Sequence, residues 1–253
     1  MSDAWNRQWQ AAQLALQFLT RLPVPGPQAL NPAALGLSPL YYPLVGLLIG
    51  SLMAGAAALA AGWFAAPLTA TLLVAGWVLV TGALHIDGLA DSADAWVGGQ
   101  GSRERTLAIM KDPASGPVAV AAVVLVLLLK VAAIAELLEG QALVYLLLAP
   151  VLGRLAIPVL FLTTPYVRDS GLGSALLAEF PRRHASALCV AVLVLLLVWS
   201  FPIGASVVLV AGAAVMVLRL IMLARLNGCT GDTLGATVEL VELAVLLALA
   251  AWV

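Results

Sequence analysis

Seven apolar stretches, each close to the length of a membrane-spanning helix, constrain the fold of this chain more than any other feature. A hydrocarbon core of ~30 Å needs about 20 apolar residues in a helix, and a helix satisfies its own backbone hydrogen bonds in lipid. Composition agrees, since 63% of the residues are hydrophobic, 10% are charged and the mean hydropathy is +1.07. We therefore predict an all-α fold, a polytopic membrane helix bundle that forms a single integral-membrane domain over 1–253. The predicted spans are 39–62, 67–86, 117–137, 141–163, 185–200, 203–224 and 234–253.

Lysine and arginine are concentrated in alternate connections between these spans. The connections near 62–66, 138–140 and 201–202 contain neither residue. Because basic loops stay in the cytoplasm, we predict a multi-pass protein of the cell inner membrane, with its N-terminus inside and its C-terminus outside. No basic stripe indicates a nucleic-acid partner, so membrane lipid is the surrounding partner. The basic residues on the predicted cytoplasmic side are Arg7, Arg21, Arg103, Arg105, Lys111, Arg168, Arg182, Arg183 and Arg225.

The first 22 residues form an amphipathic segment rather than a signal peptide, because they lack a basic-then-apolar order and a small-residue cleavage site. Their apolar residues recur every three or four positions, which indicates a helix with one apolar face. Such a helix either lies in the cytoplasmic interface of the membrane or packs against the bundle, and the sequence does not decide between the two. The residues of this face are Trp5, Trp9, Ala12, Leu16 and Leu19.

Three aspartates directly after the second predicted span form the most unusual polar feature. Asp87, Asp91 and Asp94 are four and three residues apart, so a helix gathers them on one face. Carboxylates placed so closely repel one another unless a cation neutralises them, and hard divalent ions prefer oxygen ligands. A helix cap would need only one acid. The spacing therefore predicts a metal-binding acidic face at the membrane boundary.

Other polar and glycine-rich motifs fall on the same predicted side of the membrane. We predict cytoplasmic active-site loops at 87–116 and 164–184. Acids that hold a metal, bases that take phosphate oxygens and glycines that expose backbone N–H groups together suit phosphate binding through a metal. Alone, Asp112 or Asp232 would be read as a helix cap. The further residues of this group are Lys111, Arg168, Gly171, Gly173, Asn227, Thr230, Gly231 and Asp232.

Charged residues also occur inside the predicted spans. Arg154, Glu239 and Glu242 should face the bundle interior with partners, because isolated charges there cost several kcal/mol. Either an Arg154–Glu ion pair is structural or these groups serve the site, since Glu239 shares a helical face with Asp232. We expect Lys130 to extend toward the outer interface.

These residues together resemble the signature of the cobalamin synthase family, the adenosylcobinamide-GDP ribazoletransferases of bacterial cobamide assembly. The resemblance covers nearly the whole chain, in order, with one departure at Pro113–Gly116, where the family often has Ser-Arg before its glycine. His85, two residues before Asp87, belongs to the signature but is the weaker site candidate, because it falls on the opposite side of a continuous helix. The matching segments are 18–23, 43–50, 85–94, 110–112, 153–154, 168–173 and 230–236.

The resemblance implies that a ribose hydroxyl of α-ribazole 5′-phosphate, or of α-ribazole, attacks the cobinamide-linked phosphate of adenosylcobinamide-GDP and releases GMP. A diphosphate substrate implies Mg²⁺ as cofactor, and an alcohol nucleophile benefits from a carboxylate base. The implied metal ligands are Asp87, Asp91, Asp94, Asp232 and Glu239; the implied catalytic residues are Asp91, Asp94, Lys111 and Asp232. The implied substrate-binding residues are Arg21, Lys111, Arg168, Gly171, Gly173, Asn227, Thr230 and Gly231.

Two other functions are weighed against this one. A CDP-alcohol phosphotransferase shares the opening Asp87-Gly88, but this chain departs from that motif at Asp91 and lacks its later aspartates. An ion-coupled transporter could use Arg154, Glu239 and Glu242, but its site should lie near the midplane, whereas most unusual residues here lie at one face. The sequence leaves open the number of metals and the oligomeric state, including a homo-oligomer.

Overall fold

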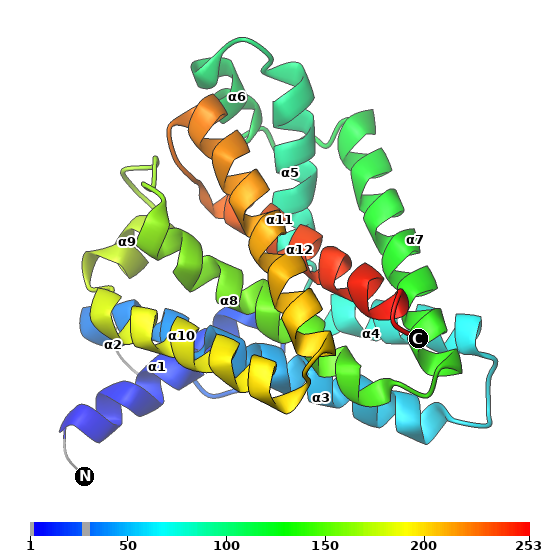
Figure 1. Cartoon of the computed structure of the whole chain (residues 1–253). Coiled ribbons are helices and arrows are strands. Elements are labelled where there is room, and N and C mark those ends of the chain that lie inside the picture. Colours follow the sequence, from blue (N-terminus) through cyan, green and yellow to red (C-terminus); the bar gives the residue numbers. More distant parts are fainter. Residues whose placement is uncertain (1–2, 27–30) are drawn as a thin grey trace.

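The computed structural model describes residues 3–26 and 31–253, and within these ranges the chain is helical (Figure 1). The described residues contain no strand, only an isolated bridge between Tyr166 and Cys229. The predicted all-α fold is therefore confirmed. The α-helices are α1 Asp3–Leu19, α2 Pro32–Leu37, α3 Tyr42–Ala60, α4 Ala66–Thr81, α5 Leu84–Gly98, α6 Arg103–Ile109, α7 Pro117–Glu139, α8 Leu148–Thr163, α9 Leu172–Ala178, α10 Arg182–Trp199, α11 Ile203–Leu226 and α12 Gly231–Ala250, and the 3-10 helices are η1 Ser38–Tyr41 and η2 Leu143–Leu147.

Six helical segments of the described chain are long and apolar enough to cross a membrane, and a bent pair, α4 with α5, would make a seventh. The prediction of about seven spans is thus confirmed, but the second span ends earlier than predicted. Helix α4 ends at Thr81, and Gly82 and Ala83 adopt left-handed φ angles of 62° and 57°. The chain then turns by 92° into α5. Because charged side chains are costly in hydrocarbon, we take α4 as the membrane-spanning part of this pair and α5, with its three aspartates, as lying outside the membrane.

The predicted active-site loops are largely helical. Segment 87–116 contains most of α5 and all of α6, and segment 164–184 contains α9 and the start of α10. The spacing of Asp87, Asp91 and Asp94 predicts a helix in the first segment, and the structure has α5 there. The role of the two segments in an active site stays a prediction. Their helical structure gives the polar side chains fixed positions.

Helices α8 and α12 form the centre of the bundle (Figure 1). In the segment formed by η2 and α8, and in α12, 72% of an apolar stretch of 18 residues is buried, against 17% in α10 and in α11. Any charged side chain on a helix that is buried on all sides needs a partner of opposite charge. Both central helices carry charged side chains. Glu242 of α12 and Arg154 of α8 form an ion pair, with both side chains fully buried.

Lys130 completes this buried network. Its Nζ lies 2.7 Å from Glu239 Oε2 and 2.5 Å from Glu242 Oε2, and 4.4 Å from the centre of the Trp77 ring. Its side chain is only 3% exposed, so the predicted extension to the outer interface was wrong. Lys130 stands near the middle of α7, too deep for its stem to reach water. Two cations and two carboxylates thus neutralise one another. Of the two alternatives left open for Arg154, the structure shows the ion pair, with Glu242 as the partner.

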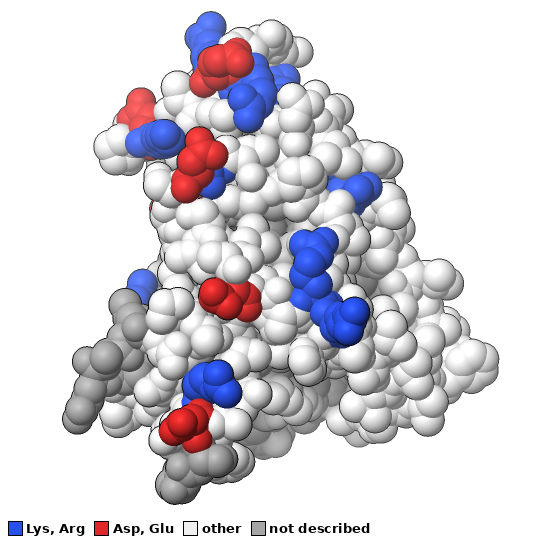
Figure 2. All heavy atoms as spheres, turned by 90° about the vertical axis from the view of Figure 1, so that its left-hand side faces the viewer, with Lys and Arg blue, Asp and Glu red and all other residues white. Residues whose placement is uncertain are grey.

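The connections group on two sides of the bundle, as the alternation of basic residues predicts. On one side, the indole of Trp252 donates to Ser206 Oγ at 2.8 Å, and Val253 lies against Gly140. On the other side, Arg103 donates to the Leu226 carbonyl at 2.8 Å. Charged side chains of both signs are scattered over the surface in Figure 2, the left-hand side of Figure 1. Which side faces the cytoplasm stays a prediction.

The N-terminal amphipathic helix is present as α1, although Met1 and Ser2 lie outside the described residues. Its buried residues are Ala11, Ala15 and Leu19, and α1 packs on α2, η1 and α3. Trp5 and Trp9 remain 58% and 59% exposed. The C-terminal half therefore packs against the bundle, while the two tryptophans are free to enter the membrane interface.

Candidate active site

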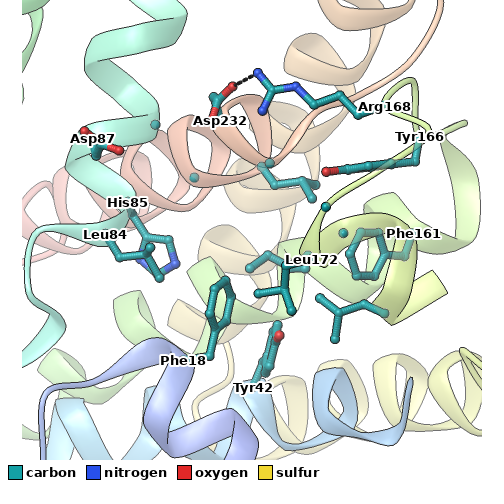
Figure 3. A pocket seen from close by; sticks show the side chains of 18 of the residues that line it. Phe18, Tyr42, Leu84, His85, Asp87, Phe161, Tyr166, Arg168, Leu172 and Asp232 are labelled. Atoms are coloured by element: carbon teal, nitrogen blue, oxygen red, sulfur yellow. Dashed lines mark hydrogen bonds and ion pairs between the residues drawn. The ribbon is translucent and has the colours of Figure 1, made fainter. Parts of the chain in front are cut away.

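The candidate site forms where α5 crosses α12, and small residues make the crossing possible. A Cβ atom on Gly88 would lie 2.7 Å from the Asp232 carbonyl oxygen and 3.2 Å from the Gly235 Cα. Small residues let helix backbones approach closely. The crossing brings Asp87 of α5 alongside Asp232 in the first turn of α12 (Figure 3).

Local hydrogen bonds fix the start of α12. Thr230 is the N-cap residue: its side chain accepts from Thr233 N at 3.2 Å, and Thr233 Oγ1 accepts from Thr230 N at 2.9 Å. This capping box satisfies two N–H groups that have no partner within the helix. The helix dipole favours an acid in the first turn. Asp232 therefore stabilises α12 whether or not it has a catalytic role.

A cavity of about 260 Å³ opens beside this crossing. Its polar end is formed by Asp87, Asp232 and Arg168, and its other end is aromatic (Figure 3). Arg168 Nη2 donates to Asp232 Oδ2 at 2.5 Å. Their side chains are 25% and 19% exposed, so the ion pair is accessible from the cavity side. The structure thus brings together three of the predicted site residues, from three separate segments of the chain.

The segment that carries Arg168 is held against the start of α12. Val167 N donates to the Cys229 carbonyl at 3.0 Å, and Cys229 N donates to the Pro165 carbonyl at 2.8 Å. These bonds form the isolated bridge between Tyr166 and Cys229. All three predicted substrate-binding glycines, Gly171, Gly173 and Gly231, line the same cavity.

Asp91 lies one helical turn beyond Asp87 in a carboxylate-rich environment. Its pKa is raised to about 6, chiefly because burial removes water from the carboxylate and further because Asp87 and Asp232 lie nearby. Within the described chain its carboxylate makes no hydrogen bond or ion pair. Bringing a cation to this environment would relieve the repulsion between the acids.

The donor set is chemically suited to Mg²⁺, since it consists of carboxylate oxygens. Among the described residues, however, no three His, Cys, Asp or Glu side chains converge closely enough to hold a metal as they stand. Asp87 and Asp232 come from different helices, and substrate phosphate oxygens often complete a magnesium shell. The magnesium ligands therefore stay a prediction.

Asp94 is turned toward α7 instead of the cavity. Its Oδ1 accepts from Ala119 N at 2.8 Å, and its Oδ2 accepts from Gly116 N. The carboxylate thereby caps the N-terminus of α7, which otherwise has no side-chain cap, and an anion is favoured there. Its predicted roles as metal ligand or base stay predictions, and they compete with this structural use.

The remaining predicted site residues lie outside the cavity lining. Lys111 is exposed after α6, and Arg21 is exposed beside Gly82 at the bend between α4 and α5. Asn227 is the exposed, left-handed C-cap of α11. Glu239 pairs with Lys130, two turns deeper in α12 than Asp232. The structure does not bring these four side chains together with Asp87.

Sequence reasoning underrated His85 and did not identify the aromatic lining. His85 is 3% exposed and lines the cavity together with Asp87, although it was expected on the far side of the helix. The cavity extends around the start of α5 because the chain bends at Gly82 and Ala83. The position of His85 within the family signature was the one signal in the sequence that could have identified it as a cavity residue.

Comparison with known proteins gives one consistent result. Residues 11–250 match the family model described as cobalamin-5-phosphate synthase. Proteins named adenosylcobinamide-GDP ribazoletransferase from Pseudomonas syringae pv. syringae, Pseudomonas putida (strain GB-1) and Stutzerimonas stutzeri are 55%, 56% and 53% identical to this chain. Each alignment covers 94% of this chain and 96% or 97% of the relative. No solved structure matches it.

Proposed function

This chain belongs to the cobalamin-5-phosphate synthase family, and we propose that it transfers the adenosylcobinamide-phosphate group from adenosylcobinamide-GDP to α-ribazole 5′-phosphate or α-ribazole. GMP is the second product. The proposal extends to this chain the activity in the names of its relatives. It places the enzyme in the cell inner membrane, with the α5–α12 crossing at the cytoplasmic face, where the nucleotide substrates are found.

The observation that carries the proposal is the polar end of the cavity, which Asp87 of α5 lines together with the Arg168–Asp232 ion pair. Phosphoryl transfer depends mostly on positioning and on stabilising charge around the phosphorus. A guanidinium binds phosphate oxygens in a fixed geometry. Arg168 would therefore exchange part of its contact with Asp232 for the diphosphate of the donor.

In the proposed step, the ribose oxygen forms a bond to the cobinamide-linked phosphorus while the bond from that phosphorus to the GMP oxygen breaks. The hydroxyl proton passes to a carboxylate. Within the described chain neither Asp87 nor Asp91 has a side-chain partner, and because Asp87 is assigned to the metal, Asp91 takes this role. Asp87 and Asp232 would hold Mg²⁺, with Asp91 close by. When bound, the ion would neutralise charge on the diphosphate and on the leaving GMP.

No observation favours the other two functions. An ion-coupled transporter would need intramembrane charges that can change partners, whereas Lys130, Arg154, Glu239 and Glu242 neutralise one another in the buried core. The family model that matches residues 11–250 is that of cobalamin-5-phosphate synthase.

The test is GMP release by the purified full-length protein from adenosylcobinamide-GDP and α-ribazole 5′-phosphate, with Mg²⁺ and with excess chelator. We expect release that requires both the acceptor and Mg²⁺. Release without acceptor would indicate a hydrolase, and no release in either condition would contradict the proposal. Uptake of substrate by proteoliposomes without GMP release would support a transporter instead.

A further inference from the structure

The cavity has a second end that the transfer chemistry above does not use. We infer that this aromatic end binds the planar base of the acceptor nucleoside, and that His85 hydrogen-bonds the acceptor's ribose. The inference rests on the proposed function, because it assigns one of the two substrates to a subsite of the same cavity.

Aromatic rings from three separate elements meet at this end (Figure 3). Phe18 lies in the last turn of α1, Tyr42 begins α3, and Phe161 lies near the end of α8. The rings of Phe18 and Tyr42 are stacked, with centroids 6.1 Å apart and an angle of 30° between their planes. Leu172 and Leu176 of α9 close the lining. Flat aromatic side chains favour a flat aromatic ligand through offset stacking.

His85 lies between the aromatic end and the polar end (Figure 3). Its side chain is buried, and neither Nδ1 nor Nε2 has a hydrogen-bond partner among the described residues. A neutral imidazole carries one donor and one acceptor, and leaving both unpaired in a buried site costs free energy. A hydroxyl group both donates and accepts. A ribose hydroxyl in the cavity would therefore satisfy a ring nitrogen that the protein leaves unpaired.

The lining favours the acceptor base over the guanine of the donor. Guanine presents several donors and acceptors on its edges, and each would need a partner when buried. Besides His85, the uncharged polar side chains of the lining are Tyr42, Tyr166 and Ser170. Tyr166 lies next to Arg168 (Figure 3), so few polar groups are left for the edges of a guanine at the aromatic end. The benzimidazole base of α-ribazole is largely apolar, so it gives up few hydrogen bonds to water when it is buried there. The corrin ring is too large for a cavity of about 260 Å³.

This arrangement also orders the acceptor correctly for reaction. With its base between the aromatic rings and its ribose beside His85, the nucleoside would direct its sugar toward Asp87 and Arg168. The attacking hydroxyl would thus meet the donor diphosphate at the polar end. His85 is here a positioning residue, which orients the acceptor without touching the phosphorus.

The direct test is calorimetric binding of α-ribazole to the purified full-length protein, without donor. We expect His85→Phe, which keeps a ring but loses both hydrogen bonds, to raise the Kd about tenfold. His85→Asn, which keeps a donor and an acceptor, should raise it less. His184, the other histidine of the chain, is exposed on α10, so His184→Phe should leave the Kd unchanged. An unchanged Kd in His85→Phe would overturn the inference.

Steady-state kinetics provide the second arm. In His85→Phe, we expect the KM for α-ribazole 5′-phosphate to rise about tenfold while the KM for adenosylcobinamide-GDP stays within about twofold. An equal rise in both KM values would indicate a general structural role and contradict the inference.

A competition experiment on the unmodified protein does not depend on any variant folding. GMP should fail to displace α-ribazole if the two occupy different ends of the cavity. Displacement at comparable concentrations would assign the aromatic end to guanine and overturn the inference. Binding of α-ribazole that is lost in His85→Phe, in a protein that releases no GMP, would leave the subsite standing while the proposed function fails.

Discussion

At the scale of single residues, the buried charges show how much a sequence can reveal about a membrane bundle. That Arg154 must have an acidic partner follows from the cost of an isolated charge in hydrocarbon, and the structure supplies Glu242. That Lys130 joins the same network could not be predicted, because its depth depends on where α7 begins and how it tilts. A Cβ on Gly153 would lie 2.7 Å from Glu242 Cγ, so the Gly153-Arg154 motif makes room for the pair.

We predict that Glu242→Gln destabilises the protein by about 3–5 kcal/mol, because it leaves the guanidinium of Arg154 buried and unpaired. Arg154→Met should have a similar cost. The double variant Arg154→Met/Glu242→Gln should cost less than the sum of the two, because no charge is left unpaired. Thermal melting of the purified variants measures this coupling. Additive losses would show that the two side chains do not interact.

At the scale of helices, the separation of α5 from α4 decides which side chains reach the site. The sequence predicted the helix that carries Asp87, Asp91 and Asp94, because the spacing of these residues along the chain is enough to indicate a helix. It did not predict the 92° bend, since Ala83 in a left-handed conformation is unusual for a residue with a Cβ atom. The capping of α7 by Asp94 could not be predicted either, because the carboxylate bonds backbone N–H groups that are 22 and 25 residues away along the chain.

The crossing of α5 and α12 gives a prediction at this scale. Gly88→Ala should lower GMP release at least tenfold, because its Cβ would lie 2.7 Å from the Asp232 carbonyl and force the two helices apart. Gly76→Ala is the matched control: Gly76 also lies within a helix, α4, and has nothing within 4 Å of an added Cβ. The control should keep full activity. Full activity in Gly88→Ala would show that the close crossing does not position the site.

At the scale of the whole molecule, hydropathy and the alternation of basic residues were enough to predict the fold class and the grouping of connections. They could not predict the packing of α8 and α12 at the centre, because the long candidate spans are apolar on nearly all sides. The site was predicted as a set of charged residues. Which of them meet depended on long-range packing, so Asp87, Asp232 and Arg168 share a cavity while Lys111 and Glu239 do not.

The orientation of the whole molecule in the membrane can be tested directly. Reporter fusions after Gly98, Gly173 and Gly228 should report the cytoplasm, and fusions after Gly62, Gly140 and Val253 should report the outside. Gly140 lies against Val253, so these two fusions must agree. A cytoplasmic Val253 together with a cytoplasmic Gly140 would mean that α4 and α5 re-enter the membrane surface without crossing.

The most direct test of the central claim, that the α5–α12 crossing is a magnesium-dependent transfer site, is the Mg²⁺ dependence of GMP release in charge-neutralised variants. Asp87→Asn and Asp232→Asn keep the side-chain shape but lose a charged oxygen ligand, so each should release GMP at least 100-fold more slowly at ordinary Mg²⁺ concentrations while melting near the parent temperature. Asp169→Asn, an exposed neighbour of Arg168, should behave as the parent. Activity within a few-fold of the parent in either Asp87→Asn or Asp232→Asn, with unchanged Mg²⁺ dependence, would contradict the account.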